Sequence, residues 1–201
     1  GGSVLDCAKL IAAGAKSEAD PWDLVLGNSP ISDALPLATV ITVAATGSEM
    51  DPHSVISNPD TKQKLGWSSS LVLPRVSYLN PAFTYTVNGW HTAAGTADIM
   101  SHTMESYFSV EEDAYLQDGI AEAILRTCIK YGPIAKADPT NEEARANLLW
   151  ANSWAINGLI GTGKAQAWSV HAMEHELSAY YDITHGVVLA ILTPHWLRHF
   201  S

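Results

Sequence analysis

The chain has 201 residues, of which 47% are hydrophobic and 16% are charged, and its formal net charge is -10. This balance is typical of a globular protein with a large core and excludes an intrinsically disordered chain. The acidic charge argues against a nucleic-acid partner, because an acidic surface repels phosphate groups. No run of about 18 apolar residues predicts a membrane span, and no secretory signal is visible.

The two cysteines, Cys7 and Cys128, are too few for a disulfide framework or a thiolate zinc site. We expect them to be reduced thiols of a cytoplasmic protein. The sequence starts directly on a glycine motif without Met and stops inside an apolar pattern. We therefore expect an internal piece that is truncated at both ends.

The first 85 residues mix helix and strand patterns. Residues 3–15 have apolar side chains at helical spacing, which predicts an amphipathic helix. Residues 21–36 are rich in proline and glycine and predict a loop. The apolar, partly β-branched run at 37–43 predicts a buried strand of the kind found in parallel sheets. Further short strands or loops are expected at residues 54–57, 63–70 and 75–79.

The pattern becomes helical after residue 86, where alanine, leucine, isoleucine and methionine recur at spacings of three and four. The predicted helices lie at residues 92–108, 113–131, 141–159 and 165–181. Pro194 is expected to break the last helical stretch. The sequence thus predicts an α/β part over residues 1–85, followed by an all-α part over residues 86–201.

Five residues of the helical part have spacings that suit a metal site. Asp98 and His102 lie four residues apart on a predicted helix, which puts both side chains on one face. His171 and His175 repeat this spacing, and His185 follows beyond the helix. Asp98 and His102 alone would be read as a helix-capping aspartate and an unrelated histidine. The three further histidines favour a site for Fe²⁺, Zn²⁺ or a similar divalent ion.

The other histidines do not fit this pattern. His195 and His199 are also four residues apart, but no acidic residue accompanies them, so we do not expect them to bind a metal. His53 and His91 are isolated and are expected to be structural or surface residues.

Two glycine- and hydroxyl-rich segments could approach a cofactor. Gly1-Gly2-Ser3 opens the first helix, whose free N–H groups suit a phosphate, and Asp6 lies one turn further on. Residues 42–48 form a small-residue loop directly after a predicted strand. Lys64 is a cation in a chain with only 11 lysines and arginines, although a solvated surface lysine is the usual alternative.

Together these motifs resemble the iron-containing alcohol dehydrogenase family, in particular its butanol dehydrogenase and broad aldehyde reductase branch. The matching segments are GGSVLDCAK at 1–9, ATGSE at 45–49, the helix that carries Asp98 and His102, NGLIGTG at 157–163, and HAMEHELSAYYDITHG at 171–186. The resemblance covers nearly the whole chain.

The resemblance implies a set of site residues. The implied metal ligands are Asp98, His102, His171 and His185, while His175 is the implied catalytic residue, close to the nicotinamide and not bound to the metal. The implied cofactor-binding residues are Gly1, Gly2, Ser3, Asp6, Thr42, Thr46, Lys64 and Leu79.

The resemblance also implies a fold of the dehydroquinate synthase-like type. Residues 1–85 would be the C-terminal part of a dinucleotide-binding domain, and residues 86–201 the N-terminal part of a helical metal-binding domain. The implied cofactors are a divalent metal, Fe²⁺ before Zn²⁺, and NAD or NADP. The implied reaction is hydride transfer between NAD(P)(H) and a short-chain alcohol or aldehyde such as butanol or butyraldehyde, in a full-length homodimer. The alternatives are a metal- and NAD-dependent lyase of the dehydroquinate synthase type and a metal-dependent hydrolase.

Overall fold

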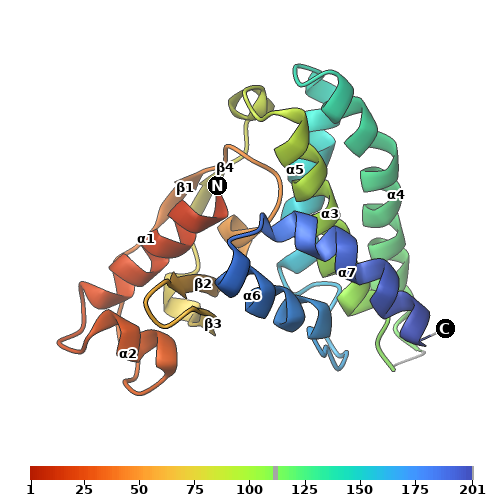
Figure 1. Cartoon of the computed structure of the whole chain (residues 1–201). Helices are drawn as coiled ribbons and strands as arrows, with labels where there is room; N and C mark the ends of the chain where they lie inside the picture. The colour runs from red at the N-terminus through yellow and green to blue at the C-terminus, as the bar shows by residue number, and fades with distance from the viewer. Residues whose placement is uncertain (111–112, 201) are drawn as a thin grey trace.

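The computed structural model describes residues 1–110 and 113–200, which leaves Ser201, the last residue of the expected helical part, outside the described residues. Two helices and short strands form one side of the molecule, and a group of longer helices forms the other (Figure 1). None of the described helices is both long and apolar enough to cross a membrane.

The first side contains two small sheets. Its elements are α1 (Gly2–Gly14), α2 (Pro21–Leu26), β1 (Ala38–Val40), η1 (Ser48–Met50), β2 (His53–Asn58), β3 (Gln63–Ser68), η2 (Ser70–Val72), β4 (Val76–Tyr78) and η3 (Pro81–Thr84). Strand β1 pairs in parallel with β4, and β2 pairs antiparallel with β3. Helix α1 packs on β2 and α2 packs on β3, so their apolar faces form one small core around Val72 and Trp67.

The second side is all helical. Its elements are α3 (Gly89–Tyr107), α4 (Tyr115–Ala137), α5 (Glu142–Ile156), α6 (Ser169–Tyr181) and α7 (His185–Phe200). Helix α3 is central, since it contacts α4, α5, α6 and α7. A larger core lies between α3, α4 and α5 and includes Ile99, Ile124 and Leu148. The expected order of an α/β part followed by a helical part is therefore confirmed.

Two local expectations are wrong. Residues 21–26 form a helix instead of a loop, because Asp20 accepts a hydrogen bond from the Trp22 N–H, Pro21 stands in the first turn and Gly27 ends the helix at φ 74°. Pro194 does not end the last helical stretch but lies inside α7. Proline removes one backbone hydrogen bond from a helix, and packing of α7 on α3 and α6 offsets that loss.

The predicted strand at residues 37–43 is found only at Ala38–Val40, where it is parallel as expected. Its expected burial is wrong, because Ala38 and Val40 are exposed. The physical reason is that β1 has its main contacts with β4 among the described elements, so no helix packs closely over its faces.

Two glycines let the backbones around α3 approach closely. A Cβ at Gly186 would lie 2.0 Å from the Ala94 carbonyl oxygen, and a Cβ at Gly95 would lie 2.2 Å from the Ala44 carbonyl oxygen. Only glycine fits such contacts. The start of α7 and the loop after β1 are thereby held against α3 one turn before Asp98.

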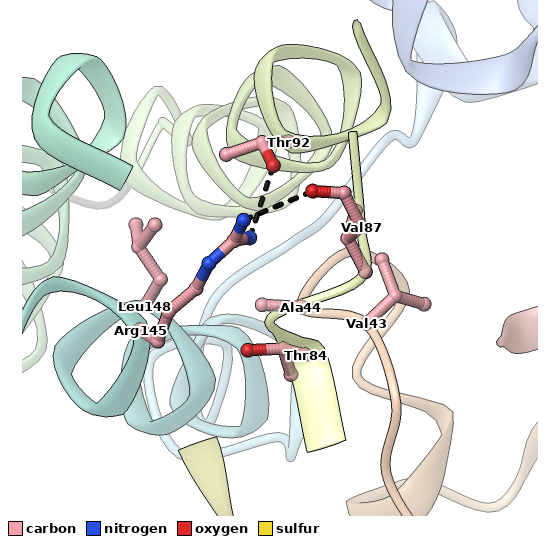
Figure 2. Close-up of a pocket in the computed structure, with 7 residues that line it drawn as sticks. All are labelled: Val43, Ala44, Thr84, Val87, Thr92, Arg145 and Leu148. Carbon is pink, nitrogen blue, oxygen red and sulfur yellow. Dashed lines mark hydrogen bonds between the residues drawn. The ribbon is translucent and has the colours of Figure 1, made fainter. Parts of the chain in front are cut away.

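Hydrogen bonds of the Arg145 side chain connect α5 to the segment that leads into α3. The Arg145 guanidinium donates hydrogen bonds to Thr92 Oγ1 at 3.0 Å and Val87 O at 3.0 Å (Figure 2). It donates a further hydrogen bond to Pro139 O at 2.9 Å. The cavity beside it has a volume of about 10 Å³, which is room for no more than a water molecule. This cluster therefore supports the fold and offers no ligand site.

Candidate metal centre and cofactor groove

The metal candidates come from three helices. Asp98 and His102 lie one turn apart on α3, His171 lies near the start of α6, and His185 is the first residue of α7. Asp98, His102 and His171 are buried, and the His185 side chain is 26% exposed. The close contact of Gly186 with Ala94 brings His185 to α3.

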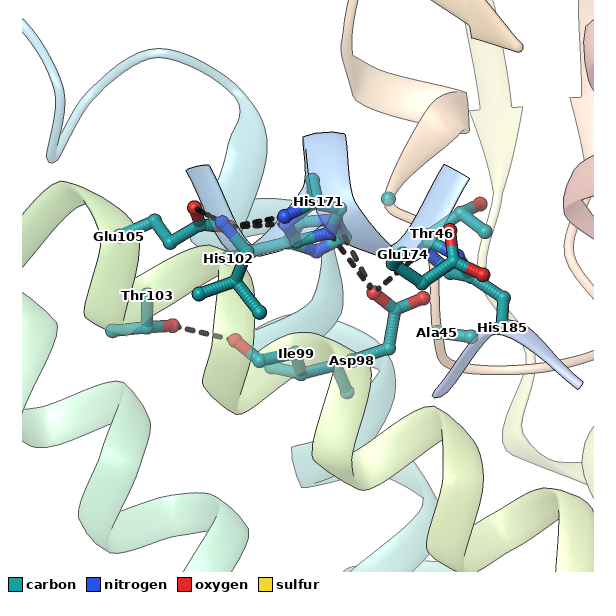
Figure 3. Close-up of polar contacts among 12 residues, drawn as sticks. Ala45, Thr46, Asp98, Ile99, His102, Thr103, Glu105, His171, Glu174 and His185 are labelled. Carbon is teal, nitrogen blue, oxygen red and sulfur yellow. Dashed lines mark hydrogen bonds and ion pairs between the residues drawn. The ribbon is translucent and has the colours of Figure 1, made fainter. Parts of the chain in front are cut away.

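The four side chains converge on one carboxylate oxygen. Asp98 Oδ1 lies 3.3 Å from His102 Nε2, 3.6 Å from His171 Nε2 and 3.5 Å from His185 Nε2 (Figure 3). Asp98, His171 and His185 offer ligand atoms that all lie within 4.8 Å of one another, whereas His102 is not part of that trio. The His102 and His171 rings are stacked, with centroids 4.6 Å apart.

These atoms fit a divalent cation. Asp98 Oδ1 and His171 Nε2 are buried without a hydrogen-bond partner among the described residues, and a buried polar group without a partner is costly. Carboxylate oxygen and imidazole nitrogen are the donors that Fe²⁺ and Zn²⁺ accept. The neighbourhood also has three buried carboxylates, those of Asp98, Glu105 and Glu174, and one ammonium, that of Lys64. Two further positive charges would balance them, and either one divalent ion or the protonated rings of His171 and His185 supply two.

The protonation behaviour of the cluster points the same way. Burial raises the pKa of Asp98, but the charges of His102 and His185 more than offset burial and hold that pKa below its usual range. Burial lowers the pKa of His171 and His185, yet carboxylates on both sides of each ring reverse this, raising the pKa of His185 to about 9. Burial, together with the charges of His171 and His185, lowers the pKa of His102 to about 3, and the opposing charge of Asp98 does not offset this shift. The pocket thus favours positive charge where His171 and His185 meet Asp98.

Two buried glutamates that the sequence analysis did not select lie behind these histidines. Glu105 Oε2 accepts a hydrogen bond from His171 Nδ1, and Glu105 Oε1 accepts one from the Val170 N–H at 2.7 Å. Glu174 Oε2 lies 2.5 Å from His185 Nδ1. Both glutamates stand three residues after a candidate ligand, at His102 and His171, but each contacts a histidine of another helix, so this spacing does not predict the contact.

His175 lies one turn after His171 on α6 and is outside the Asp98 trio. Its ring centroid is 6.0 Å from that of His185, and its Nε2 atom is 3.9 Å from Glu174 Oε2. Burial, followed by the charge of Lys64, lowers the pKa of His175 to about 4, so the ring is neutral at pH 7. The structure therefore has an uncharged imidazole beside the cluster.

Four of the predicted cofactor residues line one groove. Gly1, Gly2, Thr42 and Thr46 border a cavity of about 200 Å³ between the start of α1 and the chain that follows β1. Ser3 stands in the first turn of α1, and Leu79 is half-buried directly after β4; neither lines this cavity.

Two other predicted cofactor residues point elsewhere. The Asp6 carboxylate accepts hydrogen bonds from Ser48 Oγ at 2.6 Å and from the Val55 N–H at 2.8 Å, so it joins α1 to η1 and β2. Lys64 Nζ lies 2.8 Å from Glu174 Oε2, at the metal cluster.

Asn152 of α5 holds the loop that carries Thr46. Its Oδ1 atom accepts hydrogen bonds from the Ala45 N–H at 2.9 Å and the Gly47 N–H at 2.8 Å, and its Nδ2 atom donates to Glu49 Oε1 at 2.8 Å. These partners are more than 100 residues apart in sequence, so no local pattern predicts them. The helical side thereby sets the shape of one wall of the groove.

Comparison with known families matches both parts of the chain. The family model "Iron-containing alcohol dehydrogenase" matches residues 1–81, and the model "Fe-containing alcohol dehydrogenase family, C-terminal" matches residues 92–201. NADH-dependent butanol dehydrogenase A of Clostridium acetobutylicum is 61% identical over 199 residues, which cover 99% of this chain and 51% of that relative. NADPH-dependent aldehyde reductase YqhD of Escherichia coli is 43% identical over 197 residues, covering 96% of this chain and 51% of that relative.

Solved structures agree with these matches. The crystal structure of NADH-dependent butanol dehydrogenase A from Thermotoga maritima superimposes with a TM-score of 0.95 at 42% identity, covering 98% of this chain and 50% of that one. The chain thus spans about half of the length of the relatives that it matches.

Proposed function

The chain belongs to the iron-containing alcohol dehydrogenase family, and we propose that the full-length protein is a metal-dependent dehydrogenase that transfers a hydride between NAD(P)(H) and a short-chain alcohol or aldehyde. The observation that carries this proposal is the approach of three imidazole Nε2 atoms, from three helices, to Asp98 Oδ1 at 3.3–3.6 Å. The relatives named above are butanol dehydrogenases and an aldehyde reductase, which supports butanol and butyraldehyde as model substrates.

Asp98, His102, His171 and His185 would hold the metal. A divalent ion held there would supply a Lewis acid for the substrate oxygen, and a bound nicotinamide would supply the hydride donor or acceptor. The Asp98 carboxylate contributes the anionic charge among otherwise neutral donors. His171 and His185 keep their Nε2 atoms on the Asp98 side because their Nδ1 atoms face Glu105 and Glu174.

His175 is the proposed catalytic residue for proton movement. It is neutral at pH 7, since burial lowers its pKa to about 4. An imidazole that does not bind the metal keeps a free nitrogen, and can accept the proton of an alcohol or return it to the product of aldehyde reduction. Its side chain is 20% exposed, which leaves a route to solvent.

Gly1, Gly2, Thr42 and Thr46 support a cofactor site in the groove that they line. The N-terminus of α1 presents unpaired backbone N–H groups, which suit a pyrophosphate. The loop that carries Thr46 also packs on α3 through the contact of Ala44 with Gly95. Ser3, Asp6, Lys64 and Leu79 stay proposed cofactor positions by family resemblance, and Asp6 would act by fixing the loop through Ser48.

The proposal also includes a domain boundary at residue 85, between the cofactor-binding part and the helical metal-binding part. It further includes a homodimer of the full-length protein and a cytoplasmic location. The location is supported by the free cysteines, the exposed Cys7 and the buried Cys128, which suit a reducing compartment.

The test is elemental analysis of freshly purified full-length protein, together with the decrease in NADH and NADPH absorbance on addition of butyraldehyde. We expect one divalent ion per chain and NAD(P)H consumption that stops after chelation and returns after metal replacement. A bound metal without any NAD(P)H consumption would instead favour a hydrolase or a lyase.

A further inference from the structure

We propose that Glu174 is a positioning residue that holds the metal-ligand candidate His185 and the cofactor-side candidate Lys64 in one buried network, whereas Glu105 serves His171 alone. The inference rests on the proposed function, since it assumes that His185 and His171 bind a metal. It adds two residues to the site and links its two halves through a single carboxylate.

Glu174 is fully buried, and each of its oxygen atoms has a partner. Oε2 lies 2.5 Å from His185 Nδ1 and 2.8 Å from Lys64 Nζ. Oε1 lies 3.1 Å from Lys64 Nζ and accepts a hydrogen bond from Ser178 Oγ. A buried carboxylate surrounded by this many hydrogen-bond donors is satisfied as an anion.

The contact with Glu174 sets the orientation of His185. A carboxylate accepts a hydrogen bond only from a protonated nitrogen, so the His185 proton belongs on Nδ1. In the metal-bound form, where the ring carries one proton, the lone pair of Nε2 is then on the other side of the ring, where Asp98 Oδ1 lies 3.5 Å from Nε2. Hydrogen bonds of this kind fix the tautomer and the ring orientation of metal-binding histidines in general.

The same carboxylate explains how Lys64 can lie beside the metal cluster. Lys64 Nζ is 3.2 Å from His185 Nδ1, so its ammonium would be close to a ligand of a divalent ion. Two such cations repel each other at short range unless an anion lies between them. Glu174 supplies that anion, and it also spares the long lysine side chain part of the ordering cost of binding a cofactor.

A second metal ion is the competing explanation. Glu174, His175 and His185 offer ligand atoms within 4.8 Å of one another. However, Lys64 Nζ already contacts both carboxylate oxygens of Glu174 at 2.8 and 3.1 Å. The lysine ammonium thus takes the place of a cation in this trio, and one ion suffices for the whole cluster.

Glu105 provides the matched comparison. It accepts a hydrogen bond from His171 Nδ1, and His171 Nε2 lies 3.6 Å from Asp98 Oδ1, which repeats the arrangement of Glu174 and His185. Within the described part of the chain, the other contacts of Glu105 are the Val170 and His171 N–H groups at the start of α6, and no lysine is among them. Glu105 should therefore affect the metal without affecting the cofactor.

The experiment uses full-length Glu174→Gln, Glu105→Gln and Lys64→Met, with Glu176→Gln, an exposed glutamate on the same helix, as the control. Zn²⁺ affinity is measured by chelator competition without substrate, and NADH and NADPH affinity by fluorescence titration. Circular dichroism confirms that each variant is folded. Because no turnover is measured, failure of the wild type to bind Zn²⁺ refutes the metal site of the proposed function itself, separately from the role of Glu174.

We expect Glu174→Gln and Glu105→Gln each to weaken Zn²⁺ binding by about 10- to 100-fold. Only Glu174→Gln should also weaken cofactor binding, by about tenfold, as Lys64→Met should while it keeps its Zn²⁺ affinity. Glu176→Gln should stay within about twofold of wild type. Zn²⁺ affinity of Glu174→Gln within twofold of wild type would overturn its positioning role. An unchanged cofactor affinity in that variant, or an equal loss in Glu105→Gln, would overturn the link to Lys64.

If Glu174→Gln does not fold, Lys64→Met decides the link alone. Unchanged cofactor affinity in Lys64→Met would then refute it, and weaker cofactor binding with Zn²⁺ affinity retained would support it.

Discussion

The metal centre and the cofactor groove are built in opposite ways. At the metal centre, charged side chains from three helices are buried together, with Asp98 1%, Glu105 4% and Glu174 0% exposed. The groove is lined by glycines, threonines and apolar side chains, of which Val4 and Val40 are 74% and 56% exposed. The metal centre depends on side-chain chemistry, and the cofactor groove depends on how closely a ligand can approach the backbone. Substitutions should therefore affect metal binding and cofactor binding separately.

The largest expected effect is at the metal centre. His171→Ala removes one Nε2 donor and leaves the Glu105 carboxylate buried without its imidazole partner. We expect the full-length variant to lose its metal and roughly 1,000-fold of its activity, about 4 kcal/mol. Elemental analysis and alcohol-dependent NAD(P)H formation check this. The exposed His195→Ala is the control and should keep both; metal loss in that control instead would reverse the assignment.

His175→Ala should slow turnover without removing the metal. His175 is not in the Asp98 trio, so the metal should remain bound. Loss of a proton-transferring group typically slows turnover by about 100-fold or more. The check is kcat together with metal content in the same preparation. If the metal leaves with His175, this residue is a ligand and the proton role is wrong.

Gly2→Ala should affect the groove alone. A Cβ at Gly2 would lie 2.5 Å from Thr46 Cγ2, so Thr46 has to move. Strain of this kind costs roughly 1–3 kcal/mol, which predicts about 5- to 150-fold weaker NAD(P)H binding with the metal content unchanged. Gly14→Ala, at the other end of α1, has its nearest contact at 3.6 Å and should bind the cofactor normally. Equal affinity for both variants would argue against a cofactor at this end of α1.

The smallest effect concerns the thiols. Burial raises the pKa of the Cys128 thiol to about 12, so almost none of it is a reactive thiolate at pH 8. Cys7 is exposed on α1. Brief treatment of the folded protein with iodoacetamide should label Cys7 and spare Cys128, as peptide mass spectrometry would record. Rapid labelling of Cys128 would mean that the α4 core opens readily.

The structure brings together all four metal candidates but only four of the eight cofactor candidates, and the reason is physical. Asp98 and His102 share a helix, where a spacing of four residues fixes which side chains meet. Glu105 and Glu174 were missed because a glutamate one turn along a helix is usually solvated. Their roles depend on α6 and α7 folding back onto α3 and β3.

Contacts between distant segments explain the other differences. Lys64 meets Glu174 across 110 residues, and Asn152 meets Gly47 across 105, so neither pair leaves a local pattern. The sequence contains a capping residue, Asp20, and a terminating glycine, Gly27, that both indicate a helix at residues 21–26. The high proline and glycine content of residues 21–36 nevertheless favoured the prediction of a loop. The continuation of α7 through Pro194 depends on tertiary packing, which periodicity does not report.

The most direct test of the metal centre is anomalous X-ray diffraction from crystals of the full-length protein loaded with Zn²⁺, with data collected on both sides of the zinc absorption edge. We expect one anomalous peak beside Asp98, with the Asp98 oxygen and the Nε2 atoms of His171 and His185 about 2.0–2.2 Å away, and His102 as the fourth ligand. His175 should stay outside bonding distance. A peak at His195 and His199, or the absence of any peak beside Asp98, would contradict the account.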